Sequence, residues 1–297
     1  MNVAVIDIGS NSIRLSVYRI LEGAFTRLYT KKSMAGLAGY TCDGILSEAG
    51  VARALDALLH FKELLTLFPP DRVAVFATAS LRNISNSEEA TSSLEEGTGW
   101  PIEVLSGNEE ALLGYSGFQY DCPLPAGIMA DIGGGSTEVV SFAESVPTNM
   151  ASMPLGSLKA FNRYVEDVLP TPREVKAIQG AIDKALADAD IDTFPHHPEL
   201  CGIGGTSRAA GKLMARMSNR PTDEHSFSKA QLDDLATLLC GKSRERRDLL
   251  LKTCPERLNT VVPGVLILKA VCDHLGCSHI QISSFGVREG YVCQRIL

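Results

Sequence analysis

A repeated turn constrains the fold of this chain more than any other feature. Residues 129–142, MADIGGGSTEVVSF, place an acid and three consecutive glycines between two apolar segments. Residues 3–18, VAVIDIGSNSIRLSVY, follow the same order of apolar segment, Asp-Ile-Gly, small polar turn and apolar segment. Short segments that are rich in β-branched residues and bounded by turn formers are typical of β-strands. The repeat therefore predicts two related halves, each with a strand-turn-strand unit.

Strand and helix patterns alternate through both halves of the chain. Apolar residues at helical spacing predict a helix over residues 46–70, with Ser47 as its N-cap and Pro69-Pro70 at its end. The remaining predicted helices cover residues 85–99, ending at Gly97, and residues 108–118, 171–189, 228–241 and 261–276. The remaining predicted strands cover residues 72–80, 102–106 and 279–292, and residues 199–213 are predicted to hold a strand and a glycine turn. Interleaving of this kind favours an α/β architecture with sheets covered by helices.

Length and composition support two domains. A chain of 297 residues with 45% hydrophobic content can bury a substantial core. The Pro- and Gly-containing segment over residues 121–127 is the expected joint. One domain is then expected over residues 1–120 plus 286–297, and the second over residues 121–285.

Charge and hydropathy argue against several classes of protein. A formal net charge of −7 disfavours nonspecific binding to nucleic acid or to an anionic membrane. No Lys or Arg precedes the first apolar segment, Asp7 interrupts that segment, and we expect no apolar run long enough to span a bilayer. The 8 cysteines include no Cys-x-x-Cys pair, which favours reduced, buried thiols. We therefore expect a cytoplasmic protein.

The glycine-rich turns have the composition of a phosphate-binding site. Successive backbone N–H groups in such a turn form a concave site for an anion, and the lack of Cβ atoms lets the backbone approach closely. The candidates are Gly133, Gly134, Gly135 and Ser136 in the second copy, Ser10 and Asn11 in the first, and Gly204, Gly205 and Thr206 in a third turn, GIGGTS. A Rossmann fingerprint would need a helix directly after the turn, whereas TEVVSF has a strand pattern. The two strand-turn-strand units point instead to the actin-like ATPase architecture, in which two domains grip a phosphate chain across a cleft.

Acids flank the repeated turn. Asp131 and Glu138 stand on either side of the second copy, and Asp7 occupies the matching place in the first. Carboxylate oxygens suit Mg²⁺, which commonly binds through one or two carboxylates together with substrate phosphates. Each acid alone could equally cap a turn, but together they predict a metal-phosphate site.

Two further groups could act on a bound phosphate. Glu109 and Glu110 open a predicted helix, where the helix dipole alone also favours acids. Neighbouring helix positions diverge by about 100°, so at most one of the two faces a ligand, and that one could deprotonate an attacking water. Arg82 follows a predicted strand, and its guanidinium could either bind a phosphate through two hydrogen bonds or lie on the surface.

A set of ordered motifs resembles one family. The motifs follow one another in the same order as in the exopolyphosphatase and guanosine pentaphosphate phosphohydrolase (Ppx/GppA) family. They are AVIDIGSNSIRL, ATASLRN, IEVLSGNEEA, DIGGGSTE, MPLGS, GIGGTSR and SSFGVREG. They cover almost the whole chain. The resemblance implies an actin-like, ribonuclease H-like fold of two domains, in a short form that lacks the C-terminal helical domain of longer members.

The resemblance also implies an activity and site residues. It implies a Mg²⁺-dependent hydrolase that removes terminal phosphates from inorganic polyphosphate, with guanosine pentaphosphate as the alternative substrate. Glu110 matches the family's general base for water, and Arg82 matches a phosphate ligand. Asp131 and Glu138 match its metal ligands, and the three turns complete the phosphate clamp. The resemblance suggests a homodimer.

Departures from the family pattern concern the substrate more than the reaction. Many members carry an Arg-Leu-Gly-like stretch where this chain has SMAGLAGY. Many also carry an Arg at the position of Lys159 and an acid at the position of Asn259. Together with the short form, these changes favour short polyphosphates or a nucleotide. An actin-like sugar kinase or filament-forming ATPase, and a catalytically idle phosphate or nucleotide sensor, remain alternatives. No set of residues distinguishes polyphosphate from guanosine pentaphosphate.

Overall fold

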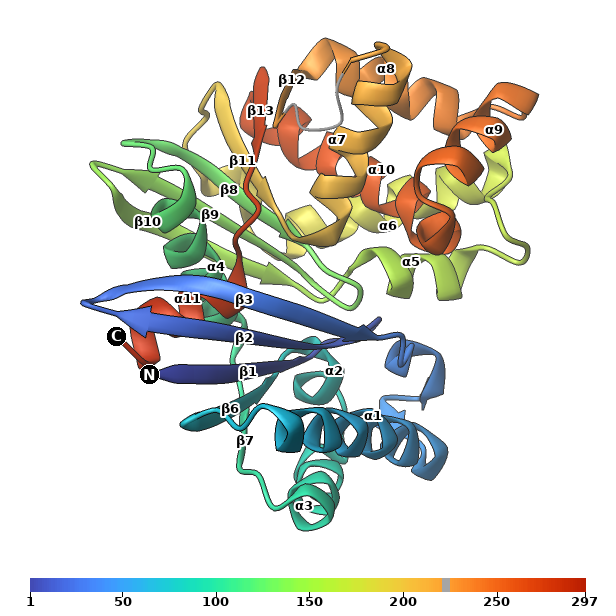
Figure 1. The fold of residues 1–297 in the computed structure, drawn as a ribbon. Coiled ribbons are helices and arrows are strands. Elements are labelled where there is room, and N and C mark those ends of the chain that lie inside the picture. Colours follow the sequence, from blue (N-terminus) through green and yellow to red (C-terminus); the bar gives the residue numbers. More distant parts are fainter. Residues whose placement is uncertain (221–224) are drawn as a thin grey trace. The chain divides into compact units, whose positions relative to one another are not determined.

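The computed structural model describes residues 1–220 and 225–297 and divides the chain into two compact units (Figure 1). Unit 1 contains residues 1–110 and 291–297, and unit 2 contains residues 111–290. The division falls inside two helices, α4 (Gly107–Asp121) and α11 (Val287–Arg295). The sequence instead placed the joint over residues 121–127, where α4 ends.

A five-stranded sheet forms the centre of unit 1. Its strands are, in spatial order, β3 (Ala24–Ser33), β2 (Ile13–Leu21), β1 (Asn2–Ile8), β6 (Arg72–Ala77) and β7 (Ile102–Val104). The first three strands pair antiparallel, whereas β6 pairs parallel with β1 and with β7. The first copy of the repeated turn joins β1 to β2, as the sequence predicts.

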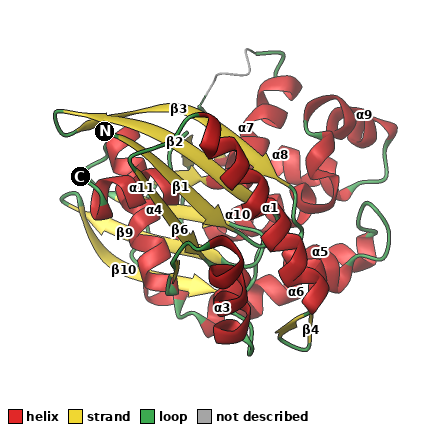
Figure 2. Ribbon diagram, turned by 60° about the horizontal axis from the view of Figure 1, so that its bottom comes forward, coloured by secondary structure: helices red, strands yellow, loops and turns green. Residues whose placement is uncertain are grey.

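Helices cover this sheet on both faces. On one face lie α1 (Glu48–Leu67) and α3 (Ser87–Thr98), which contact each other (Figure 2). Ser47 caps the N-terminus of α1, because its hydroxyl accepts the N–H of Gly50 at 3.3 Å, and the helix buries Phe61 in the core of unit 1. On the other face the ring of Tyr291, from α11, stacks on Phe76 of β6 with ring centroids 5.0 Å apart. The smaller elements of unit 1 are a 3-10 helix (Leu37–Tyr40), β4 (Thr41–Cys42), β5 (Ile45–Leu46) and α2 (Ala79–Arg82).

Unit 2 contains a six-stranded sheet with a related arrangement. Its strands are, in spatial order, β10 (Val146–Met153), β9 (Thr137–Ala143), β8 (Gly127–Ile132), β11 (Glu199–Ile203), β13 (His279–Ile282) and β12 (Ser226–Ser228). As in unit 1, the first three strands of the unit, β8, β9 and β10, pair antiparallel. The later strand β11 pairs parallel with the other edge of β8, and β13 pairs parallel with β11. The predicted α/β fold with two related halves is confirmed.

The helices of unit 2 pack on both faces of this sheet. The core on one face is shared by α5 (Ser157–Tyr164), α6 (Pro172–Asp188), α7 (Gly204–Met217), α8 (Lys229–Cys240), α9 (Arg244–Thr253) and α10 (Leu258–Leu275), with short 3-10 helices at Ile191–Thr193 and Pro255–Arg257. Helix α6 starts with a capping box of Thr171 and Glu174 and carries Pro172 in its first turn. On one face α4 contributes Phe118, which contacts Phe142 of β9.

Helix α10 is apolar because it lies in the core of unit 2. In the described part of the chain, Pro255–Leu275 is long and apolar enough to cross a membrane, a run that the sequence reading missed. However, 67% of its apolar window is buried inside the protein. Its composition therefore reflects packing against the surrounding helices and the sheet.

The predicted strand over residues 279–292 is wrong in its second half. Strand β13 ends at Ile282, and helix α11 begins at Val287. A Cβ at Gly290 would lie 1.7 Å from the carbonyl oxygen of Leu113 in α4, so these two helices approach closely through glycine. The β-branched residues of this segment gave a strand pattern, but tertiary packing decides its structure.

Other boundaries also differ from the prediction. Helix α3 ends at Thr98, and Gly99, with a φ of 71°, is its left-handed C-cap, so Gly97 lies inside the helix. Helices α5, α7 and α9 and strands β3, β10 and β12 were not predicted either. Strand β3 is largely exposed, and edge strands of this kind carry little hydrophobic pattern.

Candidate functional site

The β8–β9 turn presents backbone donors because its carbonyls are bound from behind. The N–H of Gly133 closes the turn on the Ser136 carbonyl at 3.0 Å. The first N–H groups of α5, at residues 157–159, donate to the carbonyls of Gly133 and Gly134 at 2.9–3.0 Å. In a planar trans peptide the C=O and the following N–H point in opposite directions. The N–H groups of Gly134 and Gly135 therefore point away from α5, where an anion could accept them.

Close contact between α5 and this turn depends on Gly156. A Cβ at this position would lie 2.5 Å from the carbonyl carbon of Gly134 and 2.7 Å from the nitrogen of Gly135. Real Cβ atoms do not approach backbone so closely, so only glycine allows α5 to begin here. The MPLGS motif thus supports the turn.

The β1–β2 turn of unit 1 is built in the same way. The carbonyl of Ser10 accepts the N–H of Ala38 at 3.1 Å, and the carbonyl of Asn11 accepts the N–H of Gly36 at 2.9 Å. By the same peptide geometry, the N–H groups of Asn11 and Ser12 point away from this supporting loop. Both copies of the repeated turn therefore have donors directed away from their support.

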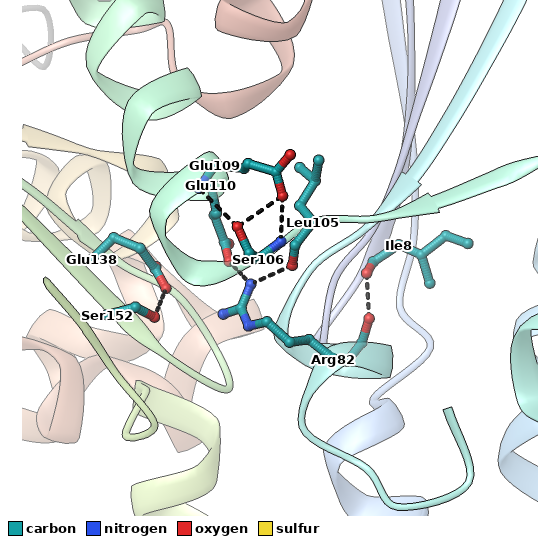
Figure 3. A network of polar contacts seen from close by, with 9 residues as sticks. Ile8, Arg82, Leu105, Ser106, Glu109, Glu110, Glu138 and Ser152 are labelled. Carbon is teal, nitrogen blue, oxygen red and sulfur yellow. Dashed lines mark hydrogen bonds and ion pairs between the residues drawn. The ribbon is translucent and has the colours of Figure 1, made fainter. Parts of the chain in front are cut away.

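Strand register places the two predicted acids of unit 2 side by side. Asp131 on β8 pairs directly with Glu138 on β9, which pairs in turn with Ser152 on β10. Glu138 is 1% exposed, and its Oε1 accepts the Ser152 hydroxyl at 2.8 Å (Figure 3). Two carboxylates directly opposite each other repel, so a cation between them would stabilise the pair.

The matching row of unit 1 has the opposite charge. Asp7 on β1 pairs with Arg14 on β2, which pairs with Lys32 on β3. An acid opposite a base is a stabilising cross-strand pair. The symmetry of the two turns therefore does not extend to their charge. Asp7 as a metal ligand stays a prediction, and the register favours the acids of unit 2 for that role.

Glu110 and Arg82 meet in unit 1. The Arg82 Nη1 lies 2.6 Å from Oε2 of Glu110 and also donates to the Leu105 carbonyl at 3.0 Å (Figure 3). Glu110 is only 8% exposed. Helix α2 carries Arg82 and is tied to β1 by the Ser80 hydroxyl, which donates to the Ile8 carbonyl. The acid and the guanidinium are thus held beside the end of β1, where the first turn begins.

Glu109, the neighbouring acid, has a different task. Its Oε2 accepts the N–H and the hydroxyl of Ser106 at 2.9 and 2.7 Å, and its own N–H donates to the Ser106 hydroxyl at 3.2 Å (Figure 3). The Ser106 N–H, and then its hydroxyl, lower the pKa of Glu109. These contacts form a capping box at the start of α4. The two acids, which helical geometry alone could not distinguish, therefore differ in their contacts.

The third glycine turn is the beginning of helix α7. Gly204 has a φ of 77°, and a Cβ there would lie 2.2 Å from Oδ1 of Asp131, so this position requires glycine. The hydroxyl of Thr206 donates to the Ile132 carbonyl at 2.8 Å, and Thr206 is 3% exposed. Its side chain therefore joins α7 to β8. A phosphate at this turn would therefore be bound by backbone N–H groups and not by the Thr206 hydroxyl.

Arg257 is a candidate that the sequence reading missed. A Cβ at Gly205 would lie 2.0 Å from Nη2 of Arg257, so the guanidinium packs on the first turn of α7. Burial lowers the pKa of Arg257, with smaller opposing effects from Glu256 and Cys254. A half-buried cation at the positive end of a helix is unfavourable unless an anion also binds there. Its position in PER, far from any glycine turn in sequence, gave no local signal.

The predicted residues form one cluster in each unit. Unit 1 brings Glu110 and Arg82 together and holds the first turn at the end of β1. Unit 2 brings together the second turn, Asp131, Glu138 and the start of α7. In the described residues no three His, Cys, Asp or Glu side chains gather as metal ligands. A pair of carboxylates still fits Mg²⁺, which also takes oxygens from phosphate and water. The predicted cleft shared by the turns stays a prediction.

Comparisons with known proteins agree with this architecture. An exopolyphosphatase from Cytophaga hutchinsonii is 22% identical, with 98% of this chain and 96% of that chain covered and a TM-score of 0.85. The PPX-GPPA enzyme of Aquifex aeolicus is 24% identical, with 99% of each chain covered and a TM-score of 0.78. These likenesses establish the actin-like fold. The family model described as the Ppx/GppA phosphatase family matches residues 16–297, and the chain therefore belongs to that family of hydrolases.

Proposed function

We propose that this protein is an exopolyphosphatase, which hydrolyses the terminal phosphate of inorganic polyphosphate. The observation that carries the proposal is the buried Glu110 held by Arg82, 2.6 Å away, on a helix whose other acid, Glu109, is occupied in the cap. A carboxylate fixed in this way can act as a base for water. Membership of the family and the likeness to the exopolyphosphatase of Cytophaga hutchinsonii favour a phosphate chain as substrate.

Backbone donors and cations would bind the substrate. In unit 2 the N–H groups of Gly134 and Gly135 and the guanidinium of Arg257 supply positive potential, and in unit 1 the Asn11 N–H and Arg82 do the same. Such groups are already oriented, so they stabilise the charge on a phosphoryl group without rearranging.

Asp131 and Glu138 would hold the metal. Their carboxylates are direct cross-strand partners, and hard oxygen ligands of this kind suit Mg²⁺. The metal, when bound, would neutralise charge on the phosphate oxygens. Ser152 orients Glu138 through its hydroxyl and so supports this role.

The reaction would be a direct attack of water. Glu110 accepts a proton from the water as the water oxygen bonds to the terminal phosphorus. The bond from that phosphorus to the bridging oxygen breaks, and the bridging oxygen leaves on the shortened chain. The products are orthophosphate, a chain one unit shorter and a proton, which Glu110 returns to solvent.

A phosphate-release assay with a substrate panel tests this function. The protein with Mg²⁺ is incubated separately with long polyphosphate, tripolyphosphate, guanosine pentaphosphate and ATP. We expect release from polyphosphate and loss of release when the metal is chelated. Faster release from guanosine pentaphosphate would assign the nucleotide as substrate, and no release from any compound would favour a sensor. The cytoplasmic location and the homodimer stay predictions.

A further inference from the structure

A buried arginine in unit 2 has no acidic partner in the part of the chain that the structure describes. Arg246, in the first turn of α9, is 3% exposed. Its Nη1 donates to the Gly241 carbonyl at 2.7 Å, and Nη1 and Nη2 both lie 3.3 Å from the Pro170 carbonyl. Its Nε has no hydrogen-bond acceptor among the described residues, and no carboxylate in that part of the chain forms an ion pair with it. Burial lowers the pKa of Arg246.

A buried guanidinium in these surroundings is unfavourable when no ligand is bound. Backbone carbonyls satisfy part of the guanidinium, but no opposite charge on residues 1–220 or 225–297 offsets the loss of water around it. Its place in the first turn of α9 adds to the cost, because the N-terminus of a helix carries partial positive charge. Arg244 and Arg247 share this turn, and Glu245, its one acid, is exposed. An anion at this position would relieve all of these effects.

A cavity of about 440 Å³ lies beside Arg246. Lys242 and Arg247 also line it, and both are exposed, so their ammonium and guanidinium groups can reach a ligand. Asp167 is the acid on its wall, and its Oδ1 accepts the N–H of Val168 at 2.7 Å. The lining therefore carries three cations against one acid. Its volume is within the range of small-molecule sites, roughly 300–1,000 Å³.

The rest of the wall is apolar. Leu169, Leu251 and Leu258 line the cavity, and Leu251 is 56% exposed. An exposed leucine beside cations is typical of a site that takes a ligand with both an apolar and a charged part. None of these residues belongs to the glycine turns or to the acidic pair of unit 2.

We propose that this cavity binds a small amphipathic anion. A carboxylate or phosphate group lies at Lys242, Arg246 and Arg247, and an apolar body lies against the leucines. Neither part alone is sufficient, because the anion offsets the buried guanidinium and the apolar body covers the exposed leucine surface. The site is separate from the one proposed for the phosphate chain.

Titration calorimetry with four simple compounds tests the proposal. The probes are octyl phosphate, octanoate, 1-octanol and inorganic phosphate, used with the full chain and below micelle-forming concentrations. We expect one octyl anion to bind per chain, about 10-fold or more tightly than 1-octanol or inorganic phosphate, since charge-assisted hydrogen bonds add to apolar burial. The tighter of the two octyl anions identifies the head group.

Matched variants locate the binding. Arg247→Glu should weaken the binding of the octyl anion by about 10-fold or more, the scale of a lost charge-assisted contact. Arg244→Glu makes the same change in the same helical turn, on a side chain that is 91% exposed and does not line the cavity, and should weaken binding much less because solvent screens its charge. Both positions are exposed, so both variants should fold.

Three results would overturn the proposal. The first is equal affinity for 1-octanol and the octyl anions, which would show that the cations take no part. The second is unchanged binding in Arg247→Glu. The third is displacement of the octyl anion by tripolyphosphate, which would assign the binding to the glycine turns instead.

Discussion

At the scale of single residues, two adjacent glutamates have separate tasks. Glu109 caps α4, and the N–H and hydroxyl of Ser106 lower its pKa, so it is bound in place as a carboxylate. Glu110 is buried beside Arg82 instead. Helical geometry alone predicts that only one of the two faces a ligand. The capping contact identifies which one is already occupied.

Arg257→Gln should weaken substrate binding. The substitution removes the cation packed on the first turn of α7, so we expect KM to rise by about 10-fold or more, the scale of a charge-assisted hydrogen bond. Arg216→Gln is the control, because Arg216 is exposed in the last turn of the same helix. Steady-state phosphate release measures both. An unchanged KM for Arg257→Gln would remove this residue from the site.

The sequence predicts the site residues that lie close together in the chain better than those that tertiary packing brings together. Asp131, Glu138 and the glycines between them form one short pattern, so their proximity can be read directly. Arg257 is brought to Gly205 by the packing of α10 and α7, which contact each other but are far apart in sequence. Contacts made by tertiary packing leave no periodic signal, and the sequence reading therefore missed it.

At the scale of elements, helix α5 holds the phosphate-binding turn. Its first N–H groups bind the carbonyls of Gly133 and Gly134, and Gly156 allows this close approach. Neither α5 nor this contact was predicted, because its eight residues give only two turns of periodicity. The MPLGS motif was visible, but its role follows only from the contact.

Gly156→Ala should impair the turn and leave the rest of the fold in place. The added Cβ would meet the backbone of Gly134 at 2.5 Å and displace it. Misplacement of binding groups by about 1 Å can cost around 100-fold in turnover, so we expect kcat/KM for phosphate release to fall by at least about 10-fold. Circular dichroism checks the fold.

Gly180→Ala is the matched control for this change. Gly180 lies in α6, and no atom lies within 4 Å of the Cβ that would be added. Alanine also has the higher helix propensity, so this variant should be as stable as the wild type or slightly more stable. Equal activity of both variants would contradict the role assigned to α5.

Charged residues join α8 to α10, and this contact should depend on pH. Burial raises the pKa of Asp273, but hydrogen bonds from Lys229 and Lys269 outweigh this effect. The pKa of Asp273 is therefore below the ordinary value for an aspartate. The Asp273 carboxylate lies 2.6 Å from Lys229 and 2.5 Å from Lys269. Because its folded pKa is lowered, its contribution to stability is present above the unfolded pKa and is lost as pH falls through the folded value.

Asp273→Asn should therefore destabilise the protein at pH 7 and have a smaller effect at pH 3. Since the side chain is 43% exposed, we expect a loss of only about 0.5–1 kcal/mol in the free energy of unfolding. Urea unfolding at both pH values measures it. Asp188→Asn, in an exposed pair with Lys184, should have no effect at either pH. A larger loss at pH 3 would contradict the assignment.

At the scale of the whole molecule, the chain contains two related halves with different charges. Both halves have an antiparallel meander, a turn with outward N–H groups and parallel strands beyond. The row beside the turn is Asp7, Arg14 and Lys32 in one half and Asp131, Glu138 and Ser152 in the other. The repeated turn predicts the shared architecture. The difference in charge needs the strand register, because it depends on which side chains are opposite each other.

The account depends above all on Glu110 as the base that prepares water for attack. The most direct measurement is the turnover number for phosphate release from polyphosphate with Mg²⁺, in Glu110→Gln and in Glu109→Gln. We expect Glu110→Gln to lose about 100-fold or more, the scale of a lost general base, with its fold unchanged. Glu109→Gln should stay near wild type, because glutamine also completes a capping box. Near-wild-type turnover in Glu110→Gln would contradict the account.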